Sequence, residues 1–203
     1  MSGSTGDGGR RLEILEATWQ LIAERGFHAV RVADIAAVCG TSTGTIHYYF
    51  PGKQDVLTEA LRHCVAQALT RQQEALREVK GARARLLRLI ELQLPKPGNV
   101  RAEWLIWLQY WAEAALPIRP QLRELHTEFY ARWQEGVLRI VERGQADGEF
   151  GGGNARDVMS RFTAMFDGLA IQLLTGVAGM DLARMRRLLV DFVDTELAPA
   201  PAH

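Results

Sequence analysis

The chain has 203 residues, of which 47% are hydrophobic, and its 24 basic and 24 acidic side chains give a net charge of zero at pH 7. This size allows one large or two small domains with a buried core. No apolar run approaches the roughly eighteen residues of a membrane span, and the Gly/Ser/Thr-rich residues 1–9 lack the apolar stretch of a secretory signal. We therefore expect a cytoplasmic protein without a membrane segment, in which residues 1–9 form a disordered tail.

The first predicted helix covers residues 10–25. Five apolar side chains recur in it at helical spacing: Leu12, Leu15, Trp19, Ile22 and Ala23. Gly26 follows and ends the helix, because a residue without a Cβ readily takes the left-handed conformation of a helix stop.

Residues 32–50 predict two short helices joined by a tight turn. The first places four residues on one face: Val32, Ile35, Ala36 and Cys39. Gly40 breaks that helix, and the hydroxyl residues 41–43 offer a cap for a second helix at about residues 43–49. The second helix buries two side chains, Ile46 and Phe50, and turns three outward, Thr45, His47 and Tyr48. This layout is typical of a helix-turn-helix and predicts DNA binding.

Six short segments in fixed register carry a resemblance to a known family: 23–27 (AERGF), 35–36 (IA), 40–42 (GTS), 44–46 (GTI), 49–50 (YF) and 53–57 (KQDVL). On these residues, the chain from about position 14 to 61 resembles the DNA-binding domain of the TetR family of bacterial transcriptional regulators. Cys39, Thr41 and His47 stand where that family most often has alanine, valine and tyrosine. His47 lies on the DNA-facing side, so we expect it to influence which operator is read.

The resemblance implies that the second short helix reads DNA. Thr43, Thr45 and Tyr48 would reach base edges or the backbone in the major groove. Because basic and acidic residues balance between positions 10 and 62, affinity depends on local placement of charge and should be strongly salt-dependent. The full expected DNA-binding set is Arg31, Thr41, Ser42, Thr43, Gly44, Thr45, His47, Tyr48, Tyr49 and Lys53.

Contacts to the DNA backbone are also implied by the resemblance. His47 and Tyr49 would touch phosphate or sugar, and Lys53 would place its ammonium group on a phosphate. Ser42 would hold a phosphate through its hydroxyl or a backbone N–H, and Gly44 would let the main chain approach closely. Two alternatives stay open: Tyr49 only packs against the first helix, and Lys53 is a solvated surface lysine.

The rest of the chain also predicts helices, so the expected fold is all-α with about nine helices. They are expected at 53–80, 82–94, 100–116, 119–144, 154–175 and 181–197, with loops at 95–98 and 146–153. The expected organisation is a three-helix DNA-binding domain at 10–52, a connecting helix at 53–80, a helical ligand-binding and dimerisation domain at 81–198, and a tail at 199–203.

Aromatic residues gather in the second half of the chain. Four of the five tryptophans lie in two adjacent predicted helices, with polar residues between them. Aromatic walls with a few polar groups are typical of small-molecule pockets, and they also hold quaternary amines. The expected ligand-binding residues are Trp104, Trp107, Leu108, Trp111, His126, Phe129, Tyr130, Trp133 and Phe166. The alternative is that these aromatics only fill the core.

Together with the Trp-rich helix, two further segments resemble the BetI-like branch of the TetR family: 148–150 (GEF) and 167–172 (DGLAIQ). The last two predicted helices have wide apolar faces that would form a four-helix bundle between two chains. The expected dimer contacts are Phe162, Leu169, Leu173, Leu182, Met185, Leu189 and Phe192. The alternative is that these helices complete the core of a single chain.

Nothing in the sequence predicts an enzyme, a metal site or a cofactor. The five histidines are scattered, and no glycine-rich phosphate loop or paired carboxylates occur. The predicted function is a ligand-responsive homodimeric repressor that binds a palindromic operator in double-stranded DNA and releases it when a small-molecule effector binds. The alternatives are an activator, or a helical ligand-binding protein whose helix-turn-helix is only structural.

Overall fold

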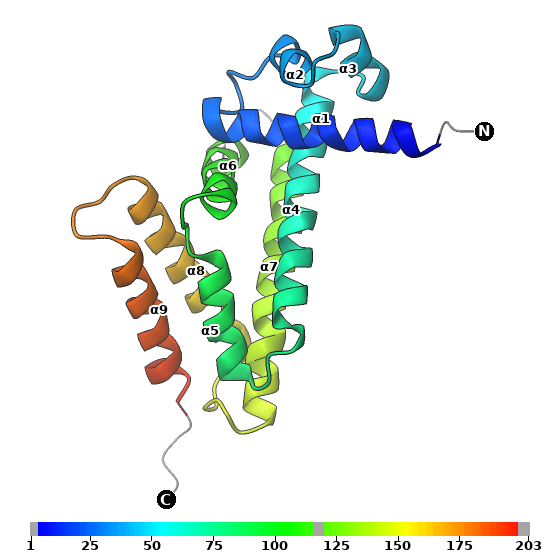
Figure 1. The fold of residues 1–203 in the computed structure, drawn as a ribbon. Helices are drawn as coiled ribbons and strands as arrows, with labels where there is room; N and C mark the ends of the chain where they lie inside the picture. The colour runs from blue at the N-terminus through cyan, green and yellow to red at the C-terminus, as the bar shows by residue number, and fades with distance from the viewer. Residues whose placement is uncertain (1–3, 116–119, 199–203) are drawn as a thin grey trace, which may run out of the picture. The chain divides into compact units, whose positions relative to one another are not determined.

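The computed structural model describes residues 4–115 and 120–198, which form nine α-helices and no β-strand (Figure 1). In chain order they are α1 (Ser4–Arg25), α2 (Val32–Val38), α3 (Thr43–Tyr49), α4 (Lys53–Arg77), α5 (Ala82–Gln93), α6 (Asn99–Ala114), α7 (Pro120–Ala146), α8 (Ala155–Leu174) and α9 (Leu182–Glu196). The prediction of an all-α fold is therefore confirmed. Within the described ranges, no helix is both long and apolar enough to cross a membrane.

The chain divides into two compact units. The first comprises Met1–Thr70 and Leu105–Gln109, and the second comprises Arg71–Trp104 and Tyr110–His203. Both α4 and α6 thus contribute residues to each unit.

The first helix begins earlier than the sequence predicts. α1 starts at Ser4, so residues 4–9 are helical and the expected disordered tail is wrong for them; residues 1–3, like the expected tail at 199–203, lie outside the described residues. Asp7 stands in the first turn, where a negative charge favours the helix dipole, and its carboxylate accepts a hydrogen bond of 2.6 Å from the Tyr49 hydroxyl. This contact spans 42 positions of sequence, and no local pattern predicts it.

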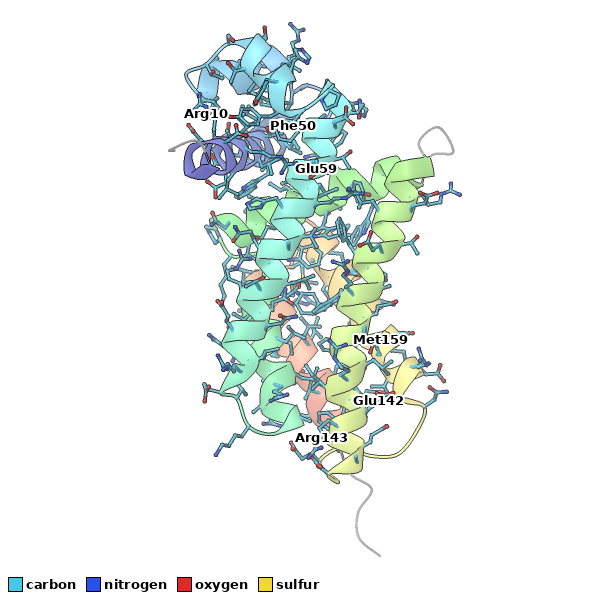
Figure 2. All side chains as sticks on the ribbon, turned by 90° about the vertical axis from the view of Figure 1, so that its right-hand side faces the viewer. Arg10, Phe50, Glu59, Glu142, Arg143 and Met159 are labelled. Atoms are coloured by element: carbon cyan, nitrogen blue, oxygen red, sulfur yellow. The ribbon has the colours of Figure 1, made fainter. Side chains whose placement is uncertain are left out.

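The core of the first unit joins α1 to the two short helices and to the first half of α4. Its fully buried side chains include Ile14, Ile22, Val30, Ile35, Ile46, Phe50, Val56 and Leu57. At the edge of this core, the Arg11 guanidinium lies 5.0 Å from the centre of the Phe50 ring and forms an ion pair of 3.2 Å with Glu59. Phe50 and Glu59 are labelled in Figure 2. Burial of Ile46 and Phe50 fixes which face of α3 turns outward.

The second unit packs α7 against α5 and α8, and α9 against α5 and α8. Two of its helices begin at the caps that the sequence predicts. The side chain of Asn154 accepts hydrogen bonds from the backbone N–H groups of Arg156 and Asp157, and that of Asp181 accepts one from Arg184. Such caps satisfy donors that the first turn of a helix leaves unpaired.

Within the single chain, the apolar faces of α8 and α9 pack largely against the core of the second unit. Four of the seven expected dimer contacts are buried within the single chain: Phe162, Leu169, Met185 and Leu189. The other three are half-buried and pack against the same core: Leu173, Leu182 and Phe192. Helical periodicity predicts that a face is buried but not which chain buries it, and here the most apolar stripe lies inside its own unit.

Candidate functional site

The turn between α2 and α3 has the backbone geometry that a helix-turn-helix requires. Gly40 has φ of +58°, and the N–H of Thr41 donates to the carbonyl oxygen of Ala36 at 2.9 Å, which closes the end of α2. The Ser42 hydroxyl then caps α3 by accepting a hydrogen bond of 3.1 Å from the backbone N–H of Thr45. The hydroxyl groups of Ser42 and Thr45 also lie 3.1 Å apart, so each is already in a hydrogen bond.

The outward face of α3 carries hydrogen-bonding groups. Thr43, Gly44 and His47 are exposed, and Tyr48 is 75% exposed, the most open of the large hydrophobic residues. The adjacent Tyr49 is half-buried, and its ring meets that of Tyr48 edge to face at 5.0 Å. This face is small, polar and unobstructed within the described part of the first unit, as a helix that enters the major groove must be.

Residues on either side of α3 are held in place by the first unit. The Lys53 ammonium donates to the carbonyl oxygen of His28 at 3.1 Å, and the backbone N–H of Arg31 donates to the Asp34 carboxylate at 2.9 Å. The Arg10 guanidinium donates to the carbonyl oxygen of Cys39 at the end of α2 at 2.8 Å. Both Lys53 and Arg10 keep donors for a phosphate.

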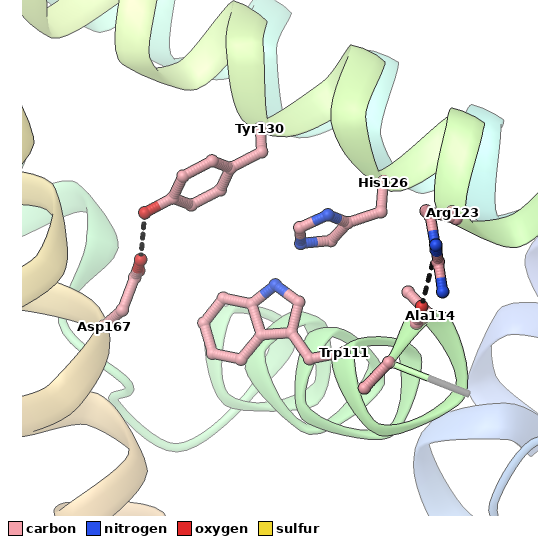
Figure 3. Close-up of a pocket in the computed structure, with 7 residues that line it drawn as sticks. Trp111, Ala114, Arg123, His126, Tyr130 and Asp167 are labelled. Atoms are coloured by element: carbon pink, nitrogen blue, oxygen red, sulfur yellow. Dashed lines mark hydrogen bonds between the residues drawn. The ribbon is translucent and has the colours of Figure 1, made fainter. Parts of the chain in front are cut away.

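The second unit contains a cavity of about 410 Å³ (Figure 3). Its lining residues come from α6 and the residue after it, from α7 and from α8: Trp111, Ala114, Ala115, Arg123, His126, Tyr130 and Asp167. This volume suits a small organic ligand.

A carboxylate stands at one end of the cavity. The Tyr130 hydroxyl donates to Asp167 Oδ2 at 2.6 Å (Figure 3). Burial raises the pKa of Asp167 to about 6, although the hydrogen bond from Tyr130 opposes that rise. At pH 7 Asp167 is therefore mostly ionised. Its carboxylate is stabilised either by protonation or by a positive charge placed beside it. Burial and the same carboxylate raise the pKa of the Tyr130 phenol, which stays protonated.

Three aromatic rings line the cavity. The imidazole of His126 stacks on the Tyr130 ring with centroids 5.6 Å apart, and Trp111 meets His126 edge to face at 6.4 Å. Burial lowers the pKa of His126, so this ring is neutral at pH 7. The aromatic faces thus add a negative electrostatic potential without adding a net charge.

Comparison with known proteins identifies the family. Residues 82–198 match the family model described as BetI-type transcriptional repressor, C-terminal, and residues 14–60 match the one described as bacterial regulatory proteins, tetR family. The chain belongs to the TetR family. It is a DNA-binding transcriptional regulator with a helix-turn-helix, in a family of regulators rather than enzymes, and the resemblance seen in the sequence is confirmed.

Individual relatives agree with this family. The HTH-type transcriptional regulator BetI 1 of Chromohalobacter salexigens is 27% identical over 202 residues, covering 96% of this chain and 93% of the relative. A transcriptional regulator from Saccharomonospora viridis, solved in complex with choline, is 45% identical with a TM-score of 0.88, covering 94% of this chain and 98% of the other. A TetR-family regulator from Rhodococcus sp. is 26% identical with a TM-score of 0.80, covering 93% and 98%.

In this TetR-family chain, three of the nine expected ligand-binding residues line the cavity: Trp111, His126 and Tyr130. Trp104 and Phe166 lie instead in the core, where their rings stack at 5.9 Å and the Trp104 indole N–H donates to the carbonyl oxygen of Gln93. Phe129 is also buried, and Trp133 packs edge to face on Phe166. For these four residues, the alternative of core packing is the one that the structure favours.

The remaining two expected residues, Trp107 and Leu108, lie in the stretch of α6 that belongs to the first unit. Spacing of three and four residues predicts one aromatic stripe along α6. Part of that stripe lies in the first unit and part in the second, so its residues have different neighbours. Sequence reasoning also missed Asp167 and Arg123 as lining residues. A signal was present for Asp167, because it is the one charged residue between Arg161 and Thr175 in an apolar helix.

Proposed function

We propose that this TetR-family regulator is a repressor whose homodimer binds a palindromic operator and releases it when a small cation occupies the cavity of the second unit. The observation that carries the proposal is the half-buried Asp167 carboxylate in a cavity with aromatic walls. The matching family model is that of a transcriptional repressor, which favours repression over activation.

The proposed effector class is a quaternary ammonium compound such as choline. A trimethylammonium group cannot donate a strong hydrogen bond, so proteins hold it by aromatic faces and a nearby carboxylate. Trp111, Tyr130 and Asp167 supply both kinds of group. The regulator from Saccharomonospora viridis, 45% identical to this chain, was solved with choline, and this supports the same class of ligand here.

The proposed operator contacts use α3. Thr43, Thr45 and Tyr48 would face base edges, while Lys53 and Arg31 would lie on phosphates. In a twofold dimer, two copies of α3 would meet half-sites about one DNA turn apart, roughly 34 Å, which accounts for a palindromic operator. The half-buried apolar residues on α8 and α9 support a dimer contact along these helices: Leu173, Leu182 and Phe192.

The proposed coupling runs along α6. Trp111 lines the cavity, and two positions earlier Gln109 belongs to the first unit, where its Oε1 accepts a hydrogen bond of 2.8 Å from the backbone N–H of Phe27. A ligand that favours one position of Trp111 would therefore also bias the contact of Gln109 at the end of α1. A differential affinity of about 3 kcal/mol between the two states would change operator affinity about a hundredfold.

The test is a gel shift with DNA from upstream of the protein's own gene, with and without choline. We expect a discrete, salt-sensitive complex that choline dissociates, and no dissociation with Asp167→Asn. Asp157→Asn is the matched control, because Asp157 is an exposed acid on the same helix. Binding of DNA that no quaternary amine disrupts would contradict the effector class, and lack of DNA binding would contradict the repressor itself.

The coupling has a separate test. Gln109→Ala should bind choline as tightly as the wild type, because Gln109 does not line the cavity. We expect the effect of choline on operator affinity to shrink by about three- to tenfold, since substitutions along a coupling route change it by such amounts. An unchanged effect of choline on operator affinity would show that the signal does not pass through this contact.

A further inference from the structure

The cavity carries a second charged group that the proposed cationic ligand does not use. Arg123 on α7 is one of its lining residues and is exposed. Its Nε donates to the carbonyl oxygen of Ala114, the last residue of α6, at 3.4 Å. A guanidinium has five N–H donors, so the Nη groups of Arg123 carry four more beside the one that this hydrogen bond uses.

The two charged groups stand at opposite ends of the cavity. In Figure 3, the pair formed by Tyr130 and Asp167 lies on one side, Arg123 lies on the other, and the rings of Trp111 and His126 lie between them. Arg123 and Tyr130 are seven residues apart, so they share one face of α7 and are separated by about 10 Å along its axis. The cavity therefore presents a negative end, an apolar aromatic middle and a positive end.

A simple cation would satisfy only the negative end of this arrangement. Asp167 and the aromatic faces would attract it, but the positive charge of Arg123 would repel it, and the guanidinium donors would find no acceptor. His126 is neutral and Tyr130 is protonated at pH 7, so neither offsets Arg123. A ligand with an anionic group beside Arg123 would satisfy both ends and would match a lining whose two charges cancel.

We infer that the preferred effector is a zwitterion, a quaternary ammonium carboxylate whose ammonium group lies against Asp167 and whose carboxylate is held by Arg123. This inference rests on the proposed function, since it names the ligand class of the same cavity. A guanidinium fork binds a carboxylate through two parallel hydrogen bonds, which also fixes the orientation of the ligand. Arg123 is then the residue that separates a betaine from choline.

The test compares two ligands that differ only in the carboxylate: (3-carboxypropyl)trimethylammonium and its methyl ester. Affinities are measured by calorimetry at pH 8, where Asp167 is ionised. We expect the wild type to bind the carboxylate about two- to fivefold more tightly than the ester, because the charge-assisted pair with the exposed Arg123 is stronger than the neutral contact that the ester makes. Arg123→Gln should abolish that preference without weakening the ester. Arg132→Gln is the matched control, because Arg132 is exposed on the same helix, pairs with Glu128 and does not line the cavity.

The possible failures are distinguishable. If the ester and choline bind, Asp167→Asn weakens both, and Arg123→Gln leaves the affinities for carboxylate and ester in the wild-type ratio, then the zwitterion inference is wrong and the cation site stands. Equal wild-type affinity for carboxylate and ester would overturn the inference in the same way, and Arg123 would then only cap α6. If none of the three ligands binds, the proposed cation site fails and the inference fails with it.

Discussion

Replacing Asp167 by asparagine should make the ligand-free protein more stable. Burial raises the pKa of this carboxyl group to about 6 from an ordinary value of 3.8, so the folded chain holds the proton more tightly than the unfolded chain. Such a group favours the fold at low pH, and this contribution is lost as the pH rises from 3.8 through 6. Above pH 6 the ionised carboxylate lowers the free energy of unfolding, compared with a neutral group at this position. A difference of about 2 pKa units corresponds to about 3 kcal/mol.

Asparagine removes the charge and keeps an oxygen that accepts the hydrogen bond from Tyr130. We therefore expect Asp167→Asn to raise the free energy of unfolding by up to about 3 kcal/mol at pH 7.5 and by about half as much at pH 5, where most of the folded wild type is already protonated. Urea denaturation followed by circular dichroism measures both values, with Asp157→Asn as the exposed control. A variant that is less stable than the wild type, or a gain that grows as the pH falls, would refute this account of Asp167.

Three further outcomes follow from the structure. Affinity for choline should fall about tenfold between pH 8 and pH 5 in calorimetry, because protonation through the pKa of about 6 removes the negative charge of Asp167; a flat profile would place the cation elsewhere. Lys53→Ala should weaken binding to every DNA sequence alike and reduce the slope of log affinity against log salt by about 1, and a change in sequence preference would contradict a phosphate contact. Gly144→Ala should lower the free energy of unfolding by about 1–3 kcal/mol, because the new Cβ would lie 2.1 Å from a ring carbon of Phe150. Gly136→Ala on the same helix is the control, with nothing within 4 Å of its Cβ, and it should be neutral or slightly stabilising.

The sequence predicts those parts of the fold that depend on neighbouring residues. Gly26 and Gly40 end the helices before them with φ of +87° and +58°, and Asn154 and Asp181 begin the helices after them. These signals act within one helical turn, so they can be read from the chain alone. The start of α1 could not be read in this way, because Asp7 is held by a tyrosine in another helix.

The candidate pocket was harder to predict, for a physical reason. Aromatic spacing identifies a buried stripe on a helix, but a core and a cavity are both lined by buried aromatics, as Trp104 and Trp111 show on the same helix. What separates a ligand site from a core is the presence of polar groups that the fold does not need. Asp167 and Arg123 are the charged residues described in the lining of this cavity, and only the packing of α6, α7 and α8 brings them together.

The same carboxylate connects stability to the proposed response. In the ligand-free protein, the partly desolvated charge of Asp167 opposes folding of the second unit at neutral pH. A bound cation would favour the ionised form and lower its pKa, so most of that unfavourable free energy would be removed on binding. An effector that removes this unfavourable free energy binds one conformation more tightly than the other. It can therefore shift the equilibrium between the two conformations without making many contacts. Natural selection for responsiveness would then maintain a residue that selection for stability alone would replace.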